Sequence, residues 1–108
     1  MIRRIWHGWT TPDNADRYLS VLSGTVIPGI RDLSIPGFLG IDVLRRDLAD
    51  EVEFATIMTF SSLDDVVAFQ GPDYARSHVP AAARDVLSRW DETATHYEVM
   101  TLPTPAEP

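Results

Sequence analysis

Two β-rich runs between Pro36 and Phe60 limit the possible folds more than any other part of the sequence. A polar turn at residues 47–51 separates them, and the lack of a helical pattern on either side predicts a hairpin. A hairpin with one face in water alternates apolar and polar residues, but here both faces are largely apolar. In the first run one face carries Phe38, Gly40 and Leu44, and the other carries Leu39, Ile41 and Val43. We therefore expect both sides of this hairpin to be covered.

The composition is that of one folded domain. The chain has 108 residues, of which 44% are hydrophobic, and this is enough for a core. Cysteine is absent from the sequence, which excludes disulfides, thiol nucleophiles and thiolate metal sites. The formal net charge of −7 repels a phosphate backbone, so we expect no nucleic-acid partner.

The sequence lacks the usual signals for membranes, export and catalysis. No apolar run approaches the roughly 20 residues of a membrane span, and the N-terminus is too interrupted for a signal peptide. These features predict a cytoplasmic protein without a membrane partner. All nine basic residues are arginine, which excludes a lysine Schiff base. A glycine-rich phosphate loop, His-Glu-x-x-His and Gly-x-Ser-x-Gly are also missing.

The first part of the chain is predicted to form a strand and then a helix. Residues 2–9 read as a strand with tryptophans on both faces. Thr11 and Pro12 are typical of a helix start. Pro28 lacks an N–H and is expected to kink or end this helix. The apolar stripe of the helix recurs at spacings of three and four: Ala15, Tyr18, Leu19, Leu22, Val26 and Ile30.

Two further helical stretches and a strand are predicted after the hairpin. Ser61 or Ser62 should cap the first of these helices, and Gly71 with Pro72 should break it. The second spans residues 80–90, and its buried side is expected to be Ala82, Val86, Leu87 and Trp90. The last strand spans residues 93–102.

This order of elements predicts an α+β domain with the ferredoxin-like βαββαβ arrangement, over residues 1–102. Its four-stranded antiparallel sheet carries helices on one face only. The other face would hold large apolar residues, which monomers rarely expose as a continuous patch. We therefore expect a homodimer in which two sheets pack face to face. Residues 103–108 include three prolines, and we expect them to form a disordered tail.

Several segments resemble the antibiotic biosynthesis monooxygenase family. They are Pro36-Gly37-Phe38-Leu39-Gly40, the later Leu44-Arg45, Ser62-Leu63-Asp64-Asp65-Val66-Val67-Ala68-Phe69, Ile5-Trp6-His7-Gly8 and His96-Tyr97-Glu98-Val99. The resemblance covers about residues 2–100 and implies a dimeric α+β barrel. It also implies one of two activities. Some members oxygenate aromatic substrates without a metal or organic cofactor, and others bind and degrade haem.

The haem-degrading relatives imply a specific set of positions. They use an Asn on the first strand, a Trp on the second helix and a proximal His after it. On this sequence the Asn position falls at His7, the Trp position at Phe69 and the His position at His78. Only the histidine is retained. The resemblance therefore disfavours haem degradation and leaves haem binding through His78 as an alternative.

Three histidines are the candidate catalytic residues. If Ile2 pairs near Thr101, His7 on the first strand lies opposite His96 on the last, with Cβ atoms about 5 Å apart. This pair would act as acid and base or bind a polar substrate oxygen. The alternative is a cross-strand polar pair without chemistry. His78, after the helix break, is either a ligand or proton carrier at the pocket mouth, or a solvated loop residue.

Trp9, Phe69 and Tyr74 are the candidate substrate-binding residues, because their rings can line an aromatic cavity. Trp9 shares the strand face of His7, and Phe69 falls at the aromatic position of the family. A metal site built from the three histidines is conceivable but has no diagnostic spacing, so no metal is predicted.

Other aromatic and basic residues are expected to be structural. Trp6 and Trp90 could also line the aromatic cavity, but packing in the core or in a dimer interface is favoured for them. Arg3 and Arg4 are predicted to be charges at the strand edge.

Together these observations predict a monooxygenase-like protein that oxidises a small aromatic or quinol-type compound with dioxygen. The substrate would bind between sheet and helices without a cofactor. His7 would remove a proton from a substrate that forms a stabilised carbanion, with His96 as its partner. A haem-binding or haem-degrading protein and a non-catalytic ligand-binding protein are the alternatives.

Overall fold

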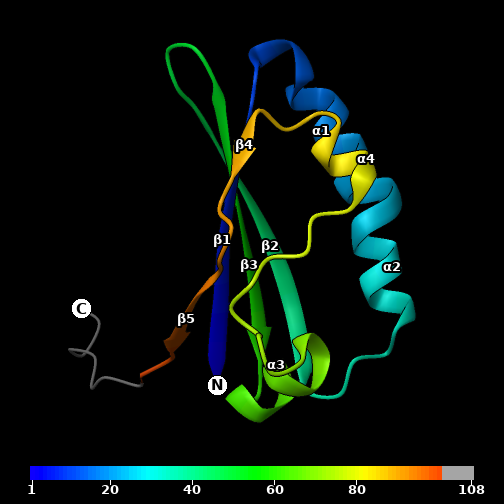
Figure 1. The fold of residues 1–108 in the computed structure, drawn as a ribbon, viewed down its shortest axis with the longest axis vertical. Coiled ribbons are helices and arrows are strands. Elements are labelled where there is room, and N and C mark those ends of the chain that lie inside the picture. Colours follow the sequence, from blue (N-terminus) through cyan, green and yellow to red (C-terminus); the bar gives the residue numbers. More distant parts are fainter. Residues whose placement is uncertain (101–108) are drawn as a thin grey trace, which may run out of the picture.

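The computed structural model describes residues 1–100, in which helices lie along one face of an antiparallel sheet (Figure 1). The strands are β1 (Ile2–Thr10), β2 (Phe38–Asp47), β3 (Val52–Phe60), β4 (Arg89–Trp90) and β5 (Thr95–Glu98). The helices are η1 (Pro12–Asn14), α1 (Ala15–Val21), η2 (Leu22–Val26), α2 (Ile27–Asp32), α3 (Leu63–Gln70) and α4 (Ala81–Arg84).

The sheet confirms the ferredoxin-like prediction. Its strands run in the order β2-β3-β1, and both β4 and β5 pair with the remaining edge of β1, always antiparallel. β4 and β5 therefore act as one fourth strand that is interrupted between Trp90 and Thr95. The last strand begins later than predicted, and β4 comes from the end of the predicted third helix. The predicted tail at residues 103–108 lies outside the described residues.

The predicted hairpin is confirmed, but a bulge changes which residues share a face. The register of β2 against β3 shifts between Phe38 and Gly40, which leaves Leu39 as an extra residue. The face toward the helices therefore carries Phe38, Ile41 and Val43, and the outward face carries Gly40, Asp42 and Leu44. The predicted grouping of Phe38 with Gly40 and Leu44 is wrong because a bulge leaves no trace in the alternation of residues.

The first helix continues through Pro28 because a π-helical segment precedes the proline. The segments η1, α1, η2 and α2 follow one another without a gap from Pro12 to Asp32. At the end of η2 the N–H of Ile27 donates to the carbonyl oxygen of Leu22, five residues earlier. This wider turn accommodates a residue that cannot donate and whose ring crowds the preceding turn.

The helix α3 begins and ends as predicted, whereas the third helical stretch is much shorter. Ser62 caps α3, because its Oγ accepts the N–H of Asp65 at 3.2 Å. Gly71 ends α3 with a φ of 91°. α4 has four residues, and its buried side chain is Ala83 instead of the predicted Ala82. No helix in residues 1–100 has the length and apolar character needed to cross a membrane.

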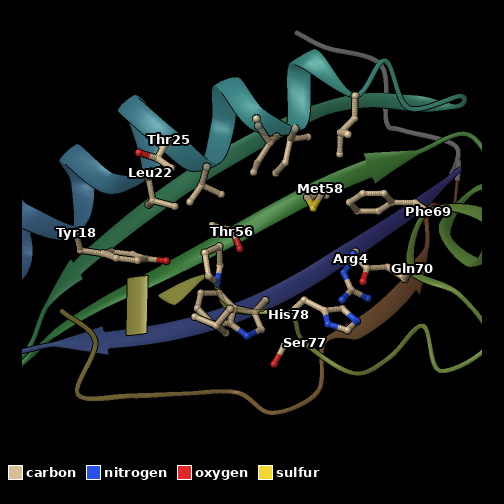
Figure 2. Close-up of a pocket in the computed structure, with 18 residues that line it drawn as sticks. Arg4, Tyr18, Leu22, Thr25, Thr56, Met58, Phe69, Gln70, Ser77 and His78 are labelled. Atoms are coloured by element: carbon tan, nitrogen blue, oxygen red, sulfur yellow. The ribbon is translucent and has the colours of Figure 1, made fainter. Parts of the chain in front are cut away.

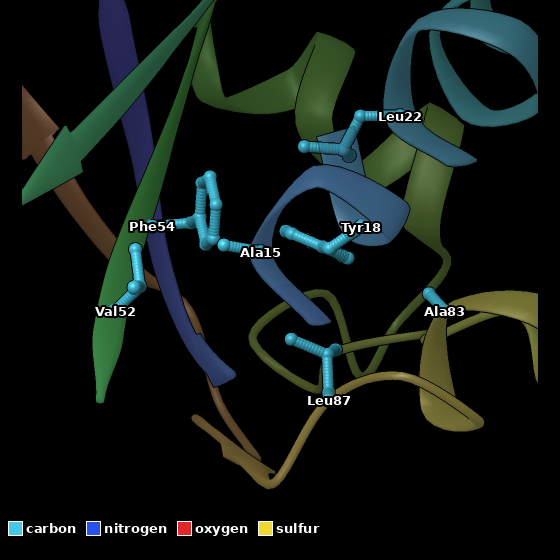
Figure 3. Close-up of a cluster of buried hydrophobic side chains, with 7 residues drawn as sticks. All are labelled: Ala15, Tyr18, Leu22, Val52, Phe54, Ala83 and Leu87. Carbon is cyan, nitrogen blue, oxygen red and sulfur yellow. The ribbon is translucent and has the colours of Figure 1, made fainter. Parts of the chain in front are cut away.

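The core lies between the first helix, one end of the sheet, and α4 with the residues after it up to Leu87, here called the α4 segment (Figure 3). Its buried members are Ala15, Tyr18, Leu22, Val52, Phe54, Ala83 and Leu87. The rings of Tyr18 and Phe54 meet edge to face with centroids 4.9 Å apart. Gly8 allows the close approach of the α4 segment, since a Cβ there would lie 2.9 Å from Leu87 Cδ2 and from the Trp6 ring.

The outward face of the sheet is more polar than predicted. Its apolar residues include Ile5, Ile57, Ala55 and Leu44, which the strand pairing places next to one another. Trp9 is also on this face, but it pairs with Glu53, and the Arg89 guanidinium lies over its ring. Asp42, Arg46 and Glu53 lie among them, and Arg46 Nη2 donates to Glu53 at 3.1 Å. The expectation of a largely apolar outward face is wrong, because the bulge in β2 turns Ile41 and Val43 toward the helices.

Candidate functional site

A pocket of about 570 Å³ lies between the sheet and the first helix (Figure 2). Arg4 and Trp6 on β1 and Thr56 and Met58 on β3 form its floor. Side chains of α1, η2 and α2 cover it, and Phe69 and the segment before α4 close one side. The pocket occupies the place between sheet and helices that the sequence predicted for a substrate.

The charge of the pocket is opposite to that of the whole chain. Most of its wall is apolar, with Leu22, Val26, Ile30, Ile41, Met58 and Phe69 among its members. The chain has 16 acidic residues, but no Asp or Glu of the described part lines the pocket. Arg4 is the one lining residue in residues 1–100 with a permanent charge. The pocket is therefore a locally positive site in an acidic protein.

Arg4 is buried without a carboxylate partner among the described residues. Its side chain is on the helix-facing side of β1, and the residue is 5% exposed. Its Nη1 donates to the carbonyl oxygen of Tyr74 at 2.5 Å, and its Nη2 donates to that of Arg76 at 3.3 Å. Burial lowers the pKa of Arg4 from its usual value, but a guanidinium stays protonated in proteins.

His96 is the third hydrogen-bond partner of Arg4, and this contact determines which nitrogen of the His96 ring carries a proton. Arg4 Nη1 lies 2.9 Å from His96 Nε2. A guanidinium has no acceptor, so Nε2 must carry the lone pair and Nδ1 the proton. Burial, and then the charge of Arg4, lower the pKa of His96. His96 is therefore a neutral acceptor, and it does not compensate the charge of Arg4.

Tyr18 supplies a polar group at another part of the pocket. The residue is 1% exposed, and Figure 2 shows its hydroxyl pointing into the pocket from the first helix. Burial raises the pKa of this hydroxyl far above its usual value of 10.0. It is therefore a neutral donor or acceptor for a ligand.

Phe69 and His78 are predicted site residues that line the pocket. Phe69 is in the last turn of α3, and its ring packs on Phe60 with centroids 6.0 Å apart. His78 lies between α3 and α4 and is exposed, so its imidazole can meet both a ligand and water. The structure thus brings these two side chains to one cavity.

His7 and Trp9 lie on the other face of the sheet. Side chains alternate along a strand, so Arg4 and Trp6 face the pocket and His7 faces away. The Nδ1 atom of His7 is 2.8 Å from Asp91 Oδ2, which also accepts the backbone N–H of His7 at 3.0 Å. The His7 ring stacks with Trp9 at a centroid distance of 6.0 Å. The predicted placement of His7 and Trp9 in the pocket is wrong.

The predicted pair of His7 and His96 is not formed. In β5, Ile2 pairs with Glu98, which places His96 opposite Arg4. The predicted register differs by three residues, and an odd shift moves a side chain to the opposite face. Residues 1–100 also contain no group of three His, Asp or Glu able to hold a metal ion, so the three-histidine alternative does not arise there.

Tyr74 contacts Arg4 and His96 but does not line the pocket. Its carbonyl oxygen is an acceptor for Arg4. Its ring packs edge to face on His96, with centroids 5.1 Å apart. The predicted substrate-binding residue Tyr74 therefore contacts the side chains that hold the guanidinium.

Sequence reasoning missed three pocket residues. The sequence predicts Arg4 as a charge at the strand edge, favours core or interface packing for Trp6 over a place in the cavity, and predicts Tyr18 as part of an apolar stripe. A usable signal was present for the first two. Arg4 shares a face with Trp6 and Gly8 in a strand predicted to be covered on both sides, and a charged residue in such a place needs a buried partner or a ligand.

Two solved structures are similar over nearly the whole chain. A proposed antibiotic biosynthesis monooxygenase from Bacillus cereus matches with a TM-score of 0.68 and 12% identity, covering 98% of this chain and 97% of its own. The haem-degrader MhuD from Mycobacterium tuberculosis, solved with two haems in its active site, matches with a TM-score of 0.57. That match has 20% identity and covers 96% of this chain and all of MhuD. The chain has the fold of these two proteins.

The predicted resemblance to antibiotic biosynthesis monooxygenases and haem-degrading relatives is thereby confirmed at the level of the fold. No protein-family model and no curated protein sequence matches the chain. The chemistry of the site therefore has to be argued from the pocket itself.

Proposed function

We propose that the protein is a monooxygenase-like enzyme that oxidises a small aromatic or quinol-type compound without a cofactor. The observation that carries this proposal is the mainly apolar pocket of about 570 Å³ with His78 on its wall. This volume lies in the range of small-molecule sites. Flat rings suit walls built from Phe69, Met58 and Trp6, because aromatic and thioether side chains pack on ring faces and edges.

His78 is the base in this proposal and takes the role that the sequence assigned to His7. An imidazole on the pocket wall can act as a general base toward a bound ligand. Removing a proton from an activated ring carbon leaves a carbanion that dioxygen can attack. In an anthrone, the two C–H bonds of the ring methylene carbon are replaced by one C=O. One oxygen atom of dioxygen stays in the product, and the other leaves as water. The substrate supplies all four electrons.

Oxygen uptake with a panel of anthrones and quinols tests this proposal. We expect uptake by the wild type and a loss of at least about a hundredfold in His78→Ala, the usual contribution of a positioned base. His7→Ala is the deciding comparison, because its side chain lies on the other face. A loss in His7→Ala with His78→Ala unaffected would contradict the assignment. Binding of the panel without oxygen uptake would favour the non-catalytic alternative.

Haem binding is the second candidate, and the donor type of His78 favours it. The imidazole of His78 would hold the haem iron, and haem would supply oxygen activation when bound. The fit is incomplete on the first strand. The position that the haem-degrading relatives fill with Asn was assigned to His7, which faces away and is bound to Asp91. Trp6 faces the pocket instead, and its indole N–H donates to the Asp91 carbonyl oxygen at 2.7 Å.

A hemin titration separates the two candidates. Haem ligation by His78 predicts a Soret band that is lost in His78→Ala and retained in His7→Ala. A Soret band that is equal in all three proteins would contradict ligation by His78.

We further propose that the protein is a homodimer in the cytoplasm, with the outward faces of two sheets in contact. The support for the dimer is the adjacent apolar group Ile5, Ile57, Ala55 and Leu44, because a monomer would leave these side chains facing water. Light scattering at micromolar concentration tests the assembly, and a stable monomer would contradict it.

A further inference from the structure

The charged groups of the pocket indicate which class of ligand it binds. This step rests on the proposed function only in taking the pocket as the substrate site. Arg4 is 5% exposed, lines the pocket and has neutral partners only among the described residues, namely two carbonyl oxygens and His96. A buried charge normally has a counter-charge. In residues 1–100 no carboxylate lies within ion-pair distance of Arg4.

The hydrogen bonds of Arg4 leave some of its N–H donors for a ligand. A guanidinium has five N–H donors in a planar fork. Within the described residues Arg4 makes three hydrogen bonds, to Tyr74, His96 and Arg76. The two remaining N–H groups have no acceptor there. A ligand oxygen in the pocket can accept from them, and a charged oxygen would do so with the greater gain.

The groups around Arg4 hold its guanidinium in place but do not neutralise its charge, so the charge is available to a ligand. His96 accepts from Nη1 as a neutral ring and is backed by Tyr74, so the guanidinium is held in place without being neutralised. The pocket itself has no acidic lining residue in the described part of the chain. An anion entering it would meet Arg4 and no opposing charge on the walls, although the whole chain carries a net charge of −7.

We propose that the pocket binds aromatic molecules as anions, with a carboxylate or phenolate oxygen on Arg4 and the ring system against Phe69 and Met58. Figure 2 shows Arg4 and Phe69 at the same end of the pocket, and the Tyr18 hydroxyl toward the other end. A ligand with a second polar group away from its anionic oxygen can therefore reach Tyr18. Arg4 is a binding residue here, and His96 is a positioning residue.

Calorimetric titration with 2-naphthoate and 2-naphthamide tests the proposal, because the two probes differ in charge and hardly in shape. The wild type should bind the acid at least about tenfold more tightly, the gain of a charge-assisted hydrogen bond. Arg4→Met should bring the ratio of the two dissociation constants near one. Arg3→Met is the matched control, since Arg3 is the next residue on the opposite face, and it should keep the wild-type ratio.

The ratio is informative only for folded protein, so circular dichroism accompanies each titration. If Arg4→Met does not fold, Arg4→Lys replaces it. Lysine keeps the charge but loses the fork, so the preference for the acid should remain and weaken. A wild type that binds both probes equally, or a preference retained in folded Arg4→Met, would overturn the proposal. A preference lost equally in Arg3→Met would also overturn it.

A second probe separates the two kinds of anion. The absorbance of 2-naphthol reports its ionisation, and a phenolate site should lower the pKa of the bound naphthol in wild type but not in Arg4→Met. A naphthoate preference without this shift identifies a site for carboxylates alone, and the preference together with the shift identifies a site that also binds phenolates. Neither probe is required to react with dioxygen. Failure of the oxygen-uptake assay therefore leaves this test intact, and failure here leaves oxygen uptake by neutral quinols intact.

Discussion

Arg4 and His96 face each other across β1 and β5, with 2.9 Å between Nη1 of one and Nε2 of the other. The contact needs a neutral imidazole, because protonation of Nε2 would set two donors against each other. It also holds the guanidinium between His96 and the carbonyl oxygens of Tyr74 and Arg76. The protonation of His96 is therefore linked to the stability of the fold around the pocket.

The first prediction is that stability falls at low pH through His96. Burial, together with Arg4, lowers the pKa of His96 in the folded protein below the usual 6.5. Between these two pKa values the unfolded chain binds a proton that the folded protein does not, so the free energy of unfolding rises with pH in that window. Above about pH 6.5, His96 should not change the free energy of unfolding. Below about pH 6.5, the free energy of unfolding should decrease as the pH is lowered.

Urea unfolding at about pH 7.5 and about pH 5.5 measures this effect. His96→Gln keeps an acceptor for Arg4 but does not titrate, so its loss of stability between the two pH values should be smaller than in the wild type. His7 and His78 are present in both proteins, so the difference isolates His96. An equal loss in the two proteins would contradict the linkage.

The second prediction concerns Gly8, where β1 meets the α4 segment. An alanine Cβ would lie 2.9 Å from Leu87 Cδ2 and from the Trp6 ring, closer than normal contact. We expect Gly8→Ala to lower the free energy of unfolding by about 1–3 kcal/mol, the usual cost of overpacking. Gly24→Ala is the control, since nothing lies within 4 Å of a Cβ in that helical position. Thermal unfolding should show Gly24→Ala unchanged or slightly more stable. The reverse order of the two variants would contradict the packing argument.

The third prediction is that the hydroxyl of Tyr18 acts on ligands and not on stability. It has no hydrogen-bond partner among the described residues and points into the pocket. Tyr18→Phe keeps the ring that packs on Phe54, so the free energy of unfolding should change by less than about 1 kcal/mol. The affinity for an aromatic acid that carries a hydroxyl group away from its carboxylate should fall, while the affinity for 2-naphthoate should not. Equal changes for both ligands would argue against a contact with the hydroxyl.

Alternation and capping patterns were enough to predict the order of elements. Ser62, Gly71 and the turn at residues 47–51 have local chemistry that marks the ends of elements, so the sequence placed them correctly. The bulge at Leu39 and the π-helical turn before Pro28 depend on backbone geometry that several sequences allow. They were not predictable from residue patterns, and the bulge determined the character of the outward face.

The site was harder to predict because it depends on the register between strands far apart in the sequence. Alternation correctly placed Arg4 with Trp6 and His7 with Trp9, but it does not say which of these faces the helices meet. It also leaves the offset of β5 against β1 open. The observed offset puts His96 beside Arg4. The pocket, the sheet-facing helices and Phe69 followed from the fold, whereas the role of Arg4 required the three-dimensional structure.

The last prediction tests the proposed dimer at the outward face. Ile57 lies at the centre of this face, opposite Ile5 on β1 and Asp42 on β2. A carboxylate there would be buried against a second sheet in a dimer, at a cost of several kcal/mol, but would remain in water in a monomer. Ile57→Asp should therefore shift the mass measured by light scattering from dimer to monomer.

Leu63→Asp is the control for this variant, because Leu63 is 39% exposed at the start of α3, where an acidic side chain suits the helix N-terminus. It should keep the wild-type mass. Ile57 is not a pocket residue, so monomeric Ile57→Asp should still bind 2-naphthoate if the pocket lies within one chain. A wild type that is already monomeric, or an Ile57→Asp variant with unchanged mass, would show that this face is not the interface. The mixture of Asp42, Arg46 and Glu53 among the apolar side chains would then be sufficient to keep the face in water.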